Sequence, residues 1–219
     1  MDTPTIAPAE TWNWVYLASA SPRRRELLAQ IGVSYRLLAV EVDETPLEGE
    51  SPTELVRRLA LAKARAGSLG LGGAGHPPVL AADTVVVLDT EILGKPRDRA
   101  DGLAMLDKLS ARHHQVFTGV ALCRGGGPLE SRVSCSRVGF RHIAPTEASA
   151  YWASGEPVDK AGAYAIQGLA AIFVNHLEGS YSGVMGLPLF ETAQLLAMAG
   201  VPLLATDRGS NSGEVKYDE

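Results

Sequence analysis

Two long strand-like segments follow one another in the middle of the chain and restrict the fold more than any other feature. HHQVFTGVALCR and SRVSCSRVGFRHI are rich in β-branched and apolar residues, and a glycine-rich link at 125–127 lies between them. Such a pair predicts a long antiparallel ladder. In the first half of the chain, shorter strand-like runs alternate with helical patterns, which adds parallel pairing. We therefore expect an α/β fold in which helices flank a long, mixed and twisted β-sheet.

Two segments carry strong signals for the start of a helix. In SPRRRELLAQIG, Ser21 is suited to the N-cap position, and Gly32 is suited to the end of the helix. In SPTELVRRLALAKARAGSLG, Ser51 and Glu54 have the spacing of a capping box. The apolar positions of this second helix place Lys63 at the edge of its packed face.

Length and composition indicate one globular domain. The chain has 219 residues, of which 46% are hydrophobic and 21% are charged. We expect a domain over residues 14–205, with loose polar tails at 1–13 and 206–219. No run approaches the roughly 18 apolar residues of a membrane helix, and the start of the chain lacks a signal-peptide pattern. We therefore expect a cytoplasmic protein that engages no membrane.

The net charge of −5 argues against broad nucleic-acid binding. A local basic pocket can still bind a small anion, because a pocket focuses the field of the charges that line it.

Asp83 is a candidate for chemistry, because it stands inside the apolar run VLAADTVVVL. A carboxylate buried there without a partner would cost several kcal/mol, so it needs a cation, a metal ion or hydrogen-bond donors. It is either a structural aspartate that accepts backbone N–H groups or a functional acid. From this residue alone the two interpretations are equally favoured.

A lysine comes close to this acid if the segment that follows it forms a β-hairpin. A two-residue turn at 89–90 places Leu88 opposite Glu91 and Thr84 opposite Lys95. Lys95 then forms either a simple ion pair with the acid or part of a phosphate site shared with a metal-binding acid.

Three consecutive arginines, Arg23 to Arg25, occupy the first turn of the first helix. Cations there are unfavourable by roughly 0.3–1 kcal/mol each. The free N–H groups of a helix start bind anions, and arginines add charge-assisted hydrogen bonds. Successive helical residues diverge by about 100°, so the three cannot share one target. We expect Arg23 and Arg24 to face an anionic ligand and Arg25 to be solvated.

These candidates together suggest a class of reaction. Glu44, in the segment VDET, can join Asp83 in offering oxygen ligands to a divalent ion. The sequence has no P-loop, no GxSxG motif, and no GxGxxG motif that opens a helix after a strand. A basic pocket, two acids and no obvious nucleophile favour metal-assisted attack of water on a phosphate.

The motifs LASASPRRRELL, VDE, AADTVVVL, GKPRD, TGV, SGEPVDKAGAYAIQG and GSYSGVMGLPL follow one another in the order found in a known family. The chain resembles the Maf family of nucleoside triphosphate pyrophosphatases from about Val15 to Ala205. The resemblance implies a fold like that of inosine-triphosphate pyrophosphatases, a cytoplasmic homodimer and a requirement for Mg²⁺ or Mn²⁺. It also implies cleavage of a nucleoside triphosphate between the α and β phosphates, which releases pyrophosphate.

The same resemblance implies roles for individual residues. Asp83 would accept the proton of the attacking water and, with Glu44, would hold the metal ion. The segment DKAGAYAIQG is similar to that of the branch acting on dTTP and UTP. The substrate-binding residues that it implies are Ser21, Arg24, Lys63 and Lys95 for the triphosphate, and Arg23, Thr84 and Gln167 for the base.

Two alternatives stay open at this point. The substrate is another nucleotide, such as CTP or 7-methyl-GTP, or the protein is a nucleotide-binding regulator of septum formation without significant turnover. The intact set of Asp83, Glu44 and Lys95 argues against the regulator, because a pure binder needs no general base. The chain departs from the family at Gly183, where asparagine is common.

Overall fold

The structure is a computed structural model that describes residues 12–72 and 74–203. Its centre is a seven-stranded sheet in the order β2-β1-β3-β5-β6-β7, with β4 also paired to β3. β1 pairs in parallel with β2 and β3, and the other pairs are antiparallel, so the expected mixed sheet is confirmed. The strands are β1 (Trp14–Leu17), β2 (Ser34–Leu37), β3 (Val79–Leu88), β4 (Glu91–Leu93), β5 (His113–Cys123), β6 (Leu129–Phe140) and β7 (Val174–Glu178).

The expected tails fall almost entirely outside the described residues. Only Trp12 and Asn13 of the N-terminal tail are described, and none of the C-terminal tail is. The ring of Trp12 packs edge-on against Trp14 of β1 at a centroid distance of 6.4 Å. This contact ties the first described residue to β1.

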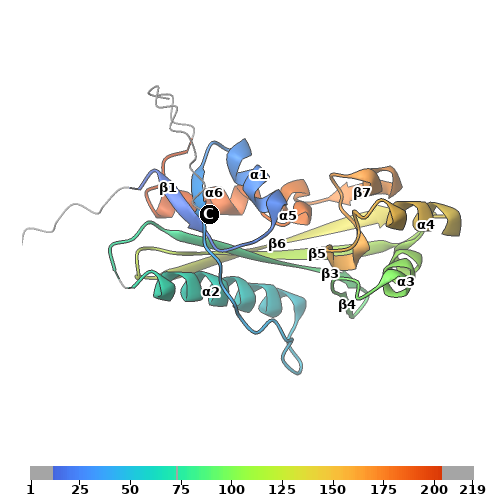
Figure 1. Cartoon of the computed structure of the whole chain (residues 1–219), viewed down its shortest axis with the longest axis horizontal. Helices are drawn as coiled ribbons and strands as arrows, with labels where there is room; N and C mark the ends of the chain where they lie inside the picture. Colours follow the sequence, from blue (N-terminus) through green and yellow to red (C-terminus); the bar gives the residue numbers. More distant parts are fainter. Residues whose placement is uncertain (1–11, 73, 204–219) are drawn as a thin grey trace, which may run out of the picture.

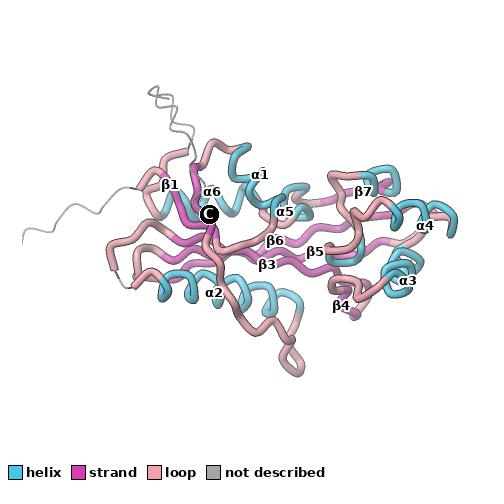
Figure 2. Tube along the Cα trace, viewed as in Figure 1, coloured by secondary structure: helices cyan, strands magenta, loops and turns pink. Residues whose placement is uncertain are grey.

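Helices cover both faces of the sheet (Figure 1). α2 lies along one face, and α1, α5 and α6 lie on the other, while α3 and α4 gather at one end with β4 and β7 (Figures 1 and 2). No helix in the described part of the chain is long and apolar enough to cross a membrane. The helices are α1 (Pro22–Gln30), α2 (Pro52–Gly70), α3 (Arg99–Leu109), α4 (Pro145–Ala153), α5 (Tyr181–Met185) and α6 (Leu189–Met198), with short 3₁₀ helices η1 (Ala161–Ala163) and η2 (Leu169–Phe173).

The side chains of β3 alternate between the two faces and so divide the core. Leu80 and Ala82 pack with α1 and α6 on one face, whereas Ala81 and Val85 pack toward α2 on the other. Because both faces are covered, nearly every residue of β3 is buried, which explains its continuous apolar run. The alternation points Asp83 to the α2 face and the next residue to the opposite face.

Gly119 of β5 lets α2 approach the sheet closely. A Cβ atom at this position would lie 2.3 Å from the carbonyl oxygen of Val56, which is a backbone atom of α2. Gly119 is also the register partner of Asp83. The absence of a side chain therefore brings α2 down onto the sheet directly beside the acid.

The two predicted helix starts behave differently. α2 has the expected capping box, in which Ser51 and Glu54 bind each other's backbone N–H groups. α1 begins at Pro22 as expected, but the side chain of Ser21 makes no capping hydrogen bond, so that part of the prediction is wrong. The hydroxyl of Ser21 lines a pocket instead, as described below.

One predicted strand begins later than expected. The apolar and β-branched residues of AIFVNHLEG predict a strand from Ala171, but the strand begins only at Val174. The residues before it belong to η2, whose first N–H groups donate to a carboxylate from another segment. That contact is long-range in the fold, so the local strand propensity does not reveal it.

Candidate active site

A gap in the sheet defines the site. β1 pairs with β3 only at Val79 and Leu80, and β4 pairs with it only from Val86 to Leu88. Among the described residues, no strand pairs with the stretch 81–85 along this edge of β3. Side chains from both faces of β3 therefore reach the same opening.

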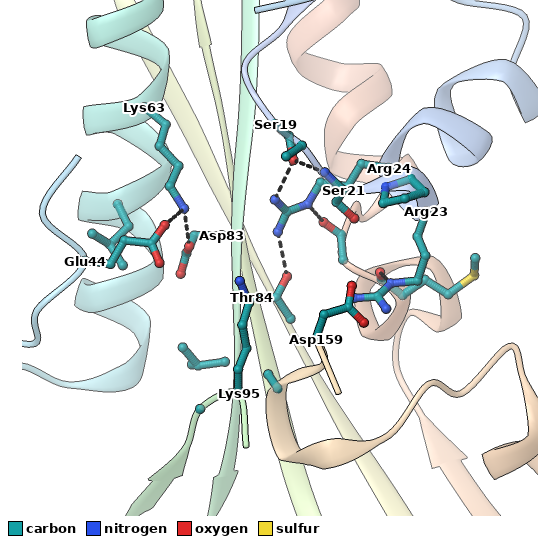
Figure 3. Close-up of a pocket in the computed structure, with 18 of the residues that line it drawn as sticks. Ser19, Ser21, Arg23, Arg24, Glu44, Lys63, Asp83, Thr84, Lys95 and Asp159 are labelled. Atoms are coloured by element: carbon teal, nitrogen blue, oxygen red, sulfur yellow. Dashed lines mark hydrogen bonds and ion pairs between the residues drawn. The ribbon is translucent and has the colours of Figure 1, made fainter. Parts of the chain in front are cut away.

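The opening is a pocket of about 860 Å³, and every site residue that the sequence analysis assigns lines it. Figure 3 shows the acids and Lys63 on one side of β3 and the arginines on the other. The geometry thus brings these residues together, while their roles stay predictions. The assigned residues lining the pocket are Ser21, Arg23, Arg24, Glu44, Lys63, Asp83, Thr84, Lys95 and Gln167.

Lys63 joins the two acids. Its ammonium nitrogen lies 2.7 Å from Oδ1 of Asp83 and 2.5 Å from Oε1 of Glu44. Asp83 is only 8% exposed, whereas the side chain of Glu44 is 57% exposed. Burial raises the pKa of Glu44, but the hydrogen bond to Lys63 and nearby positive charges outweigh it and lower this pKa overall. Both acids are therefore held beside one cation.

The donor set fits a divalent ion of the magnesium type. Carboxylate oxygens are hard ligands, and Mg²⁺ is commonly bound by one or two carboxylates together with substrate phosphates. Asp83 and Glu44 already share one cationic partner, which shows that their oxygens converge. Among the described residues, no group of three or more His, Cys, Asp or Glu side chains could hold a metal ion. The pair thus suits a metal ion that shares its ligands with a phosphate.

Lys95 faces the same acids from the far end of the gap. The predicted hairpin register is confirmed, with Leu88 opposite Glu91, but the ladder ends at Val86 and Leu93. Thr84 and Lys95 therefore do not pair, because the chain leaves the strand at Gly94. Lys95 still lines the pocket, and its positive charge helps lower the pKa of Glu44.

Arg24 is half-buried on the opposite side of β3. Its guanidinium donates to the carbonyl of Gly186 at 2.7 Å, to the hydroxyl of Ser19 at 3.0 Å and to the hydroxyl of Thr84 at 3.2 Å. These three acceptors are uncharged. Burial lowers the pKa of Arg24 to about 10, so the guanidinium remains charged at neutral pH. A partly desolvated cation held by neutral acceptors favours an anionic ligand.

Arg23 also turns into the pocket, whereas Arg25 does not line it. Nε of Arg23 donates to the carbonyl of Met185 at 3.2 Å, and Asp159 lies beside its guanidinium (Figure 3). Burial lowers the pKa of Arg23, while the charge of Asp159 opposes this effect. The expected division among the three arginines is therefore found in the geometry, although Arg25 is half-buried.

The hydroxyl of Thr84 belongs to a directed chain of hydrogen bonds. Thr118 donates its only hydroxyl proton to the carbonyl of Gly183 at 2.8 Å. Thr84 must therefore donate to Thr118, at 2.9 Å, and accept from Arg24. The chain links Arg24 to α5 through two threonines, and it commits the only proton of Thr84 within the protein.

Gln167 lies on the irregular segment between η1 and η2. Its Oε1 atom is buried and has no hydrogen-bond partner among the described residues. Because the residue also lines the pocket, this oxygen is a ready acceptor for a donor group of a ligand.

Sequence reasoning missed several residues of the site. Ser19 and Thr118 position Arg24 directly or through Thr84, and Asp159 faces Arg23. A serine two residues before an N-cap and a threonine within a strand carry no distinctive pattern. Asp159 is the first residue of the segment DKAGAYAIQG, which also contains Gln167, and this position is its only signal.

The fold and the pocket define an α/β protein whose site suits a polyphosphate. Four cationic side chains, Arg23, Arg24, Lys63 and Lys95, line a pocket with a convergent carboxylate pair. The family model described as Maf-like protein matches residues 14–199. The chain belongs to the Maf family.

Relatives of high similarity cover most of the chain. One from Alkalilimnicola ehrlichii, named dTTP/UTP pyrophosphatase, is 59% identical over 83% of this chain and 91% of its own length. Another of that name, from Nitrosomonas europaea, is 53% identical over 90% of this chain and 98% of its own length. Among solved structures, the Staphylococcus aureus Ham1 protein is similar at 16% identity with a TM-score of 0.42, covering 57% of this chain and 71% of that chain. The family assignment rests on the sequence relatives.

Proposed function

We propose that this protein hydrolyses dTTP and UTP to the nucleoside monophosphate and pyrophosphate. The observation that carries the reaction is the pair of acids, Asp83 and Glu44, converging on Lys63 inside a pocket lined by cationic side chains. The names of the relatives support the reaction and the two substrates. A pocket for binding alone would not need a buried carboxylate aimed at an anionic ligand.

The cationic side chains bind and orient the triphosphate. Arg24 is fixed by its three hydrogen bonds, so it presents its charge without reorganisation. Lys63 and Lys95 approach the same space from α2 and from the segment after β4. The hydroxyl of Ser21 and the first N–H groups of α1 add uncharged donors. Positioning by these groups supplies much of the acceleration.

Asp83 takes the proton of the attacking water. Of the two carboxylate oxygens of Asp83, only Oδ1 accepts a hydrogen bond from the described residues, and its donor is Lys63. Oδ2 is therefore the atom that receives the proton. Glu44 and Asp83 would hold Mg²⁺ or Mn²⁺. The bound ion would neutralise the negative charge that develops on the phosphates.

Gln167 selects the base. Its buried Oε1 atom has no partner among the described residues and needs a donor. Uracil and thymine carry a proton on N3, whereas cytosine has an unprotonated N3 acceptor. If Oε1 faces N3 of the base, CTP leaves this oxygen without a donor. The unsatisfied oxygen weakens the binding free energy of CTP by roughly 1–3 kcal/mol, which favours UTP and dTTP.

We further propose that the protein is a cytoplasmic homodimer, as its family membership suggests. Light scattering after size-exclusion chromatography tests the dimer, and a mass corresponding to one 23.1 kDa chain would contradict it. Fractionation of the source cells tests the location.

Pyrophosphate release from a panel of nucleoside triphosphates tests the proposed reaction. We expect release from dTTP and UTP with Mg²⁺ or Mn²⁺, and a loss of at least about 100-fold in Asp83→Asn. Asp107→Asn, on the exposed face of α3, is the control and should keep full activity. Turnover of Asp83→Asn at the level of the original chain would exclude Asp83 as the base. Saturable binding without release from any nucleotide would reject the reaction.

A further inference from the structure

The segment that carries Gln167 is held at both ends by two side chains, those of Tyr151 in α4 and of Glu156 in the turn that follows this helix. At its start, the N–H group of Ala165 donates to the hydroxyl of Tyr151 at 3.1 Å. At its end, the N–H group of Leu169 donates to Oε2 of Glu156 at 2.9 Å. The segment closes on itself in between, where the N–H group of Gly168 donates to the carbonyl of Ala165 at 3.0 Å. Its backbone conformation is therefore set from outside as well as from within.

Glu156 is the centre of this arrangement. Its Oε1 atom accepts from the hydroxyl of Tyr151 at 2.7 Å and from the N–H group of Ala170 at 3.4 Å. Together with Leu169, these donors occupy both carboxylate oxygens. The carboxylate also lies at the start of η2, where free N–H groups favour a negative charge.

Tyr151 connects the two ends of the segment. Burial, and then the hydrogen bond to Glu156, raise the pKa of Tyr151, so the phenol stays protonated and donates to the carboxylate. Its ring is buried and packs edge-on against Phe173 at a centroid distance of 5.4 Å. We call Tyr151 and Glu156, with their hydrogen bonds to the Gln167 segment, the clamp. The ring of Tyr151 anchors the clamp in the core.

Gly168, the neighbour of Gln167, allows the carboxylate to come this close. A Cβ atom at this position would lie 2.1 Å from Oε2 of Glu156. Any side chain here would expel the carboxylate from its place. Gly168 therefore gives a way to break the clamp without altering either of the two side chains that form it.

We propose that Glu156, acting with Tyr151, is the positioning residue for base selection, because it fixes the backbone that aims Gln167 into the pocket. This inference rests on the proposed function, in which Gln167 reads the base. Neither Glu156 nor Tyr151 lines the pocket, so neither contacts the nucleotide. The clamp explains how an amide on an irregular segment can discriminate between bases, since selection needs a fixed acceptor.

Glu156→Gln, Tyr151→Phe and Gly168→Ala each weaken the clamp in a different way. The first turns one oxygen into an N–H donor, the second removes the hydroxyl, and the third displaces the intact carboxylate. Glu147→Gln is a matched control, because its carboxylate binds Arg141 and the start of α4 outside the pocket. Thermal unfolding identifies the variants that fold. Because the three variants weaken the clamp independently, the test can still be made if one of them does not fold.

The test is the preference for UTP over CTP, measured both as the ratio of kcat/KM and as the ratio of dissociation constants with Mg²⁺. We expect the clamp variants to lose roughly 10- to 100-fold of this preference, mainly through a higher KM for UTP. In Glu147→Gln the preference should equal that of the original chain. A general loss of stability would lower activity toward both nucleotides and leave the ratio unchanged.

The outcomes separate this inference from the proposed function. A preserved ratio in folded clamp variants would overturn the inference and leave the function intact. Equal binding of UTP and CTP by the original chain would overturn it as well, because there would be no selection to position. Preferential binding of UTP without turnover would reject the proposed reaction, and the binding ratio would still decide the role of Glu156.

Discussion

The ammonium nitrogen of Lys63 lies 2.7 Å from Oδ1 of Asp83, and the same nitrogen also contacts Glu44. The lysine therefore offsets one of the two negative charges of the carboxylates that are assigned to a divalent ion. Two unit charges about 4 Å apart interact by about 4 kcal/mol at the effective dielectric constant of a protein surface. An ammonium and a metal ion thus compete for the same oxygens.

We expect Lys63→Met to bind Mn²⁺ roughly tenfold more tightly than the original chain when no nucleotide is present, which corresponds to about 1.4 kcal/mol. The removal of the ammonium leaves a buried carboxylate without its cation, so the melting temperature should fall without metal and recover with it. Isothermal titration of the nucleotide-free protein measures the affinity. Lys108→Met, which removes an exposed partner of Glu91, is the control. Equal or weaker binding of Mn²⁺ by Lys63→Met would show that the ammonium does not compete.

We expect Thr84→Val to affect all nucleotides alike. The substitution removes one of the three acceptors of Arg24 and leaves the buried hydroxyl of Thr118 without its donor. The free energy of unfolding should fall by roughly 1–3 kcal/mol. The value of kcat/KM should also fall, and by the same factor for dTTP, UTP and CTP. Thr84→Ser keeps the hydroxyl and should restore most of the loss. A change confined to one base would instead support the direct role in base selection that the family resemblance implies.

We expect Gly119→Ala to push α2 away from the sheet. The added Cβ atom would lie 2.3 Å from a backbone oxygen of α2, and a backbone atom cannot move alone. The free energy of unfolding should fall by roughly 1–3 kcal/mol, and activity should fall because Lys63 moves with the helix. Gly70→Ala, at the end of the same helix and in open space, is the control and should be neutral or stabilising. Thermal unfolding and kcat/KM check both variants.

We expect stability to depend on pH through His114. This residue is 2% exposed, donates or accepts one hydrogen bond with Tyr164, and has a buried Nδ1 atom without a partner among the described residues. Burial, and then the charge of His113, lower the pKa of His114 to about 4 from its ordinary value of 6.5. Between these values the unfolded chain binds more protons than the folded one, so stability rises with pH.

The measurement is the free energy of unfolding between pH 4 and 6.5, compared with His114→Gln. The contribution of His114 should have a slope of up to about 1.4 kcal/mol per pH unit and should disappear in the variant. His113→Gln, at the exposed neighbouring position, should keep most of the slope. Parallel pH profiles for the original chain and His114→Gln would contradict the prediction.

Much of the fold is predictable because its signals are local. The apolar run of β3, the pair of β5 and β6, and the capping box of α2 each lie within one continuous stretch of sequence. α5 was not predicted, since Tyr181–Met185 is short and contains glycine and serine. η2 is not predictable from its own residues, because the carboxylate that holds its start comes from Glu156, outside the segment.

The site is predictable residue by residue but not in its arrangement. Asp83 is conspicuous because a carboxylate in an apolar strand needs a partner, and the arginines are conspicuous at a helix start. That Lys63 is the partner depends on how closely α2 packs at Gly119. The gap beside Asp83 depends on where β1 and β4 stop pairing with β3, and no local pattern encodes this.

α1 and α2, which both reach the pocket, differ in how they begin. α2 contains its own cap in Ser51 and Glu54, whereas α1 has none from the side chain of Ser21. A missing side-chain cap leaves a helix less stable by roughly 1 kcal/mol. A phosphate bound there, as proposed, would complete the helix as well as bind to it. The nucleotide would then act as a removable part of the secondary structure, and we expect the first turn of α1 to be most rigid while substrate is held.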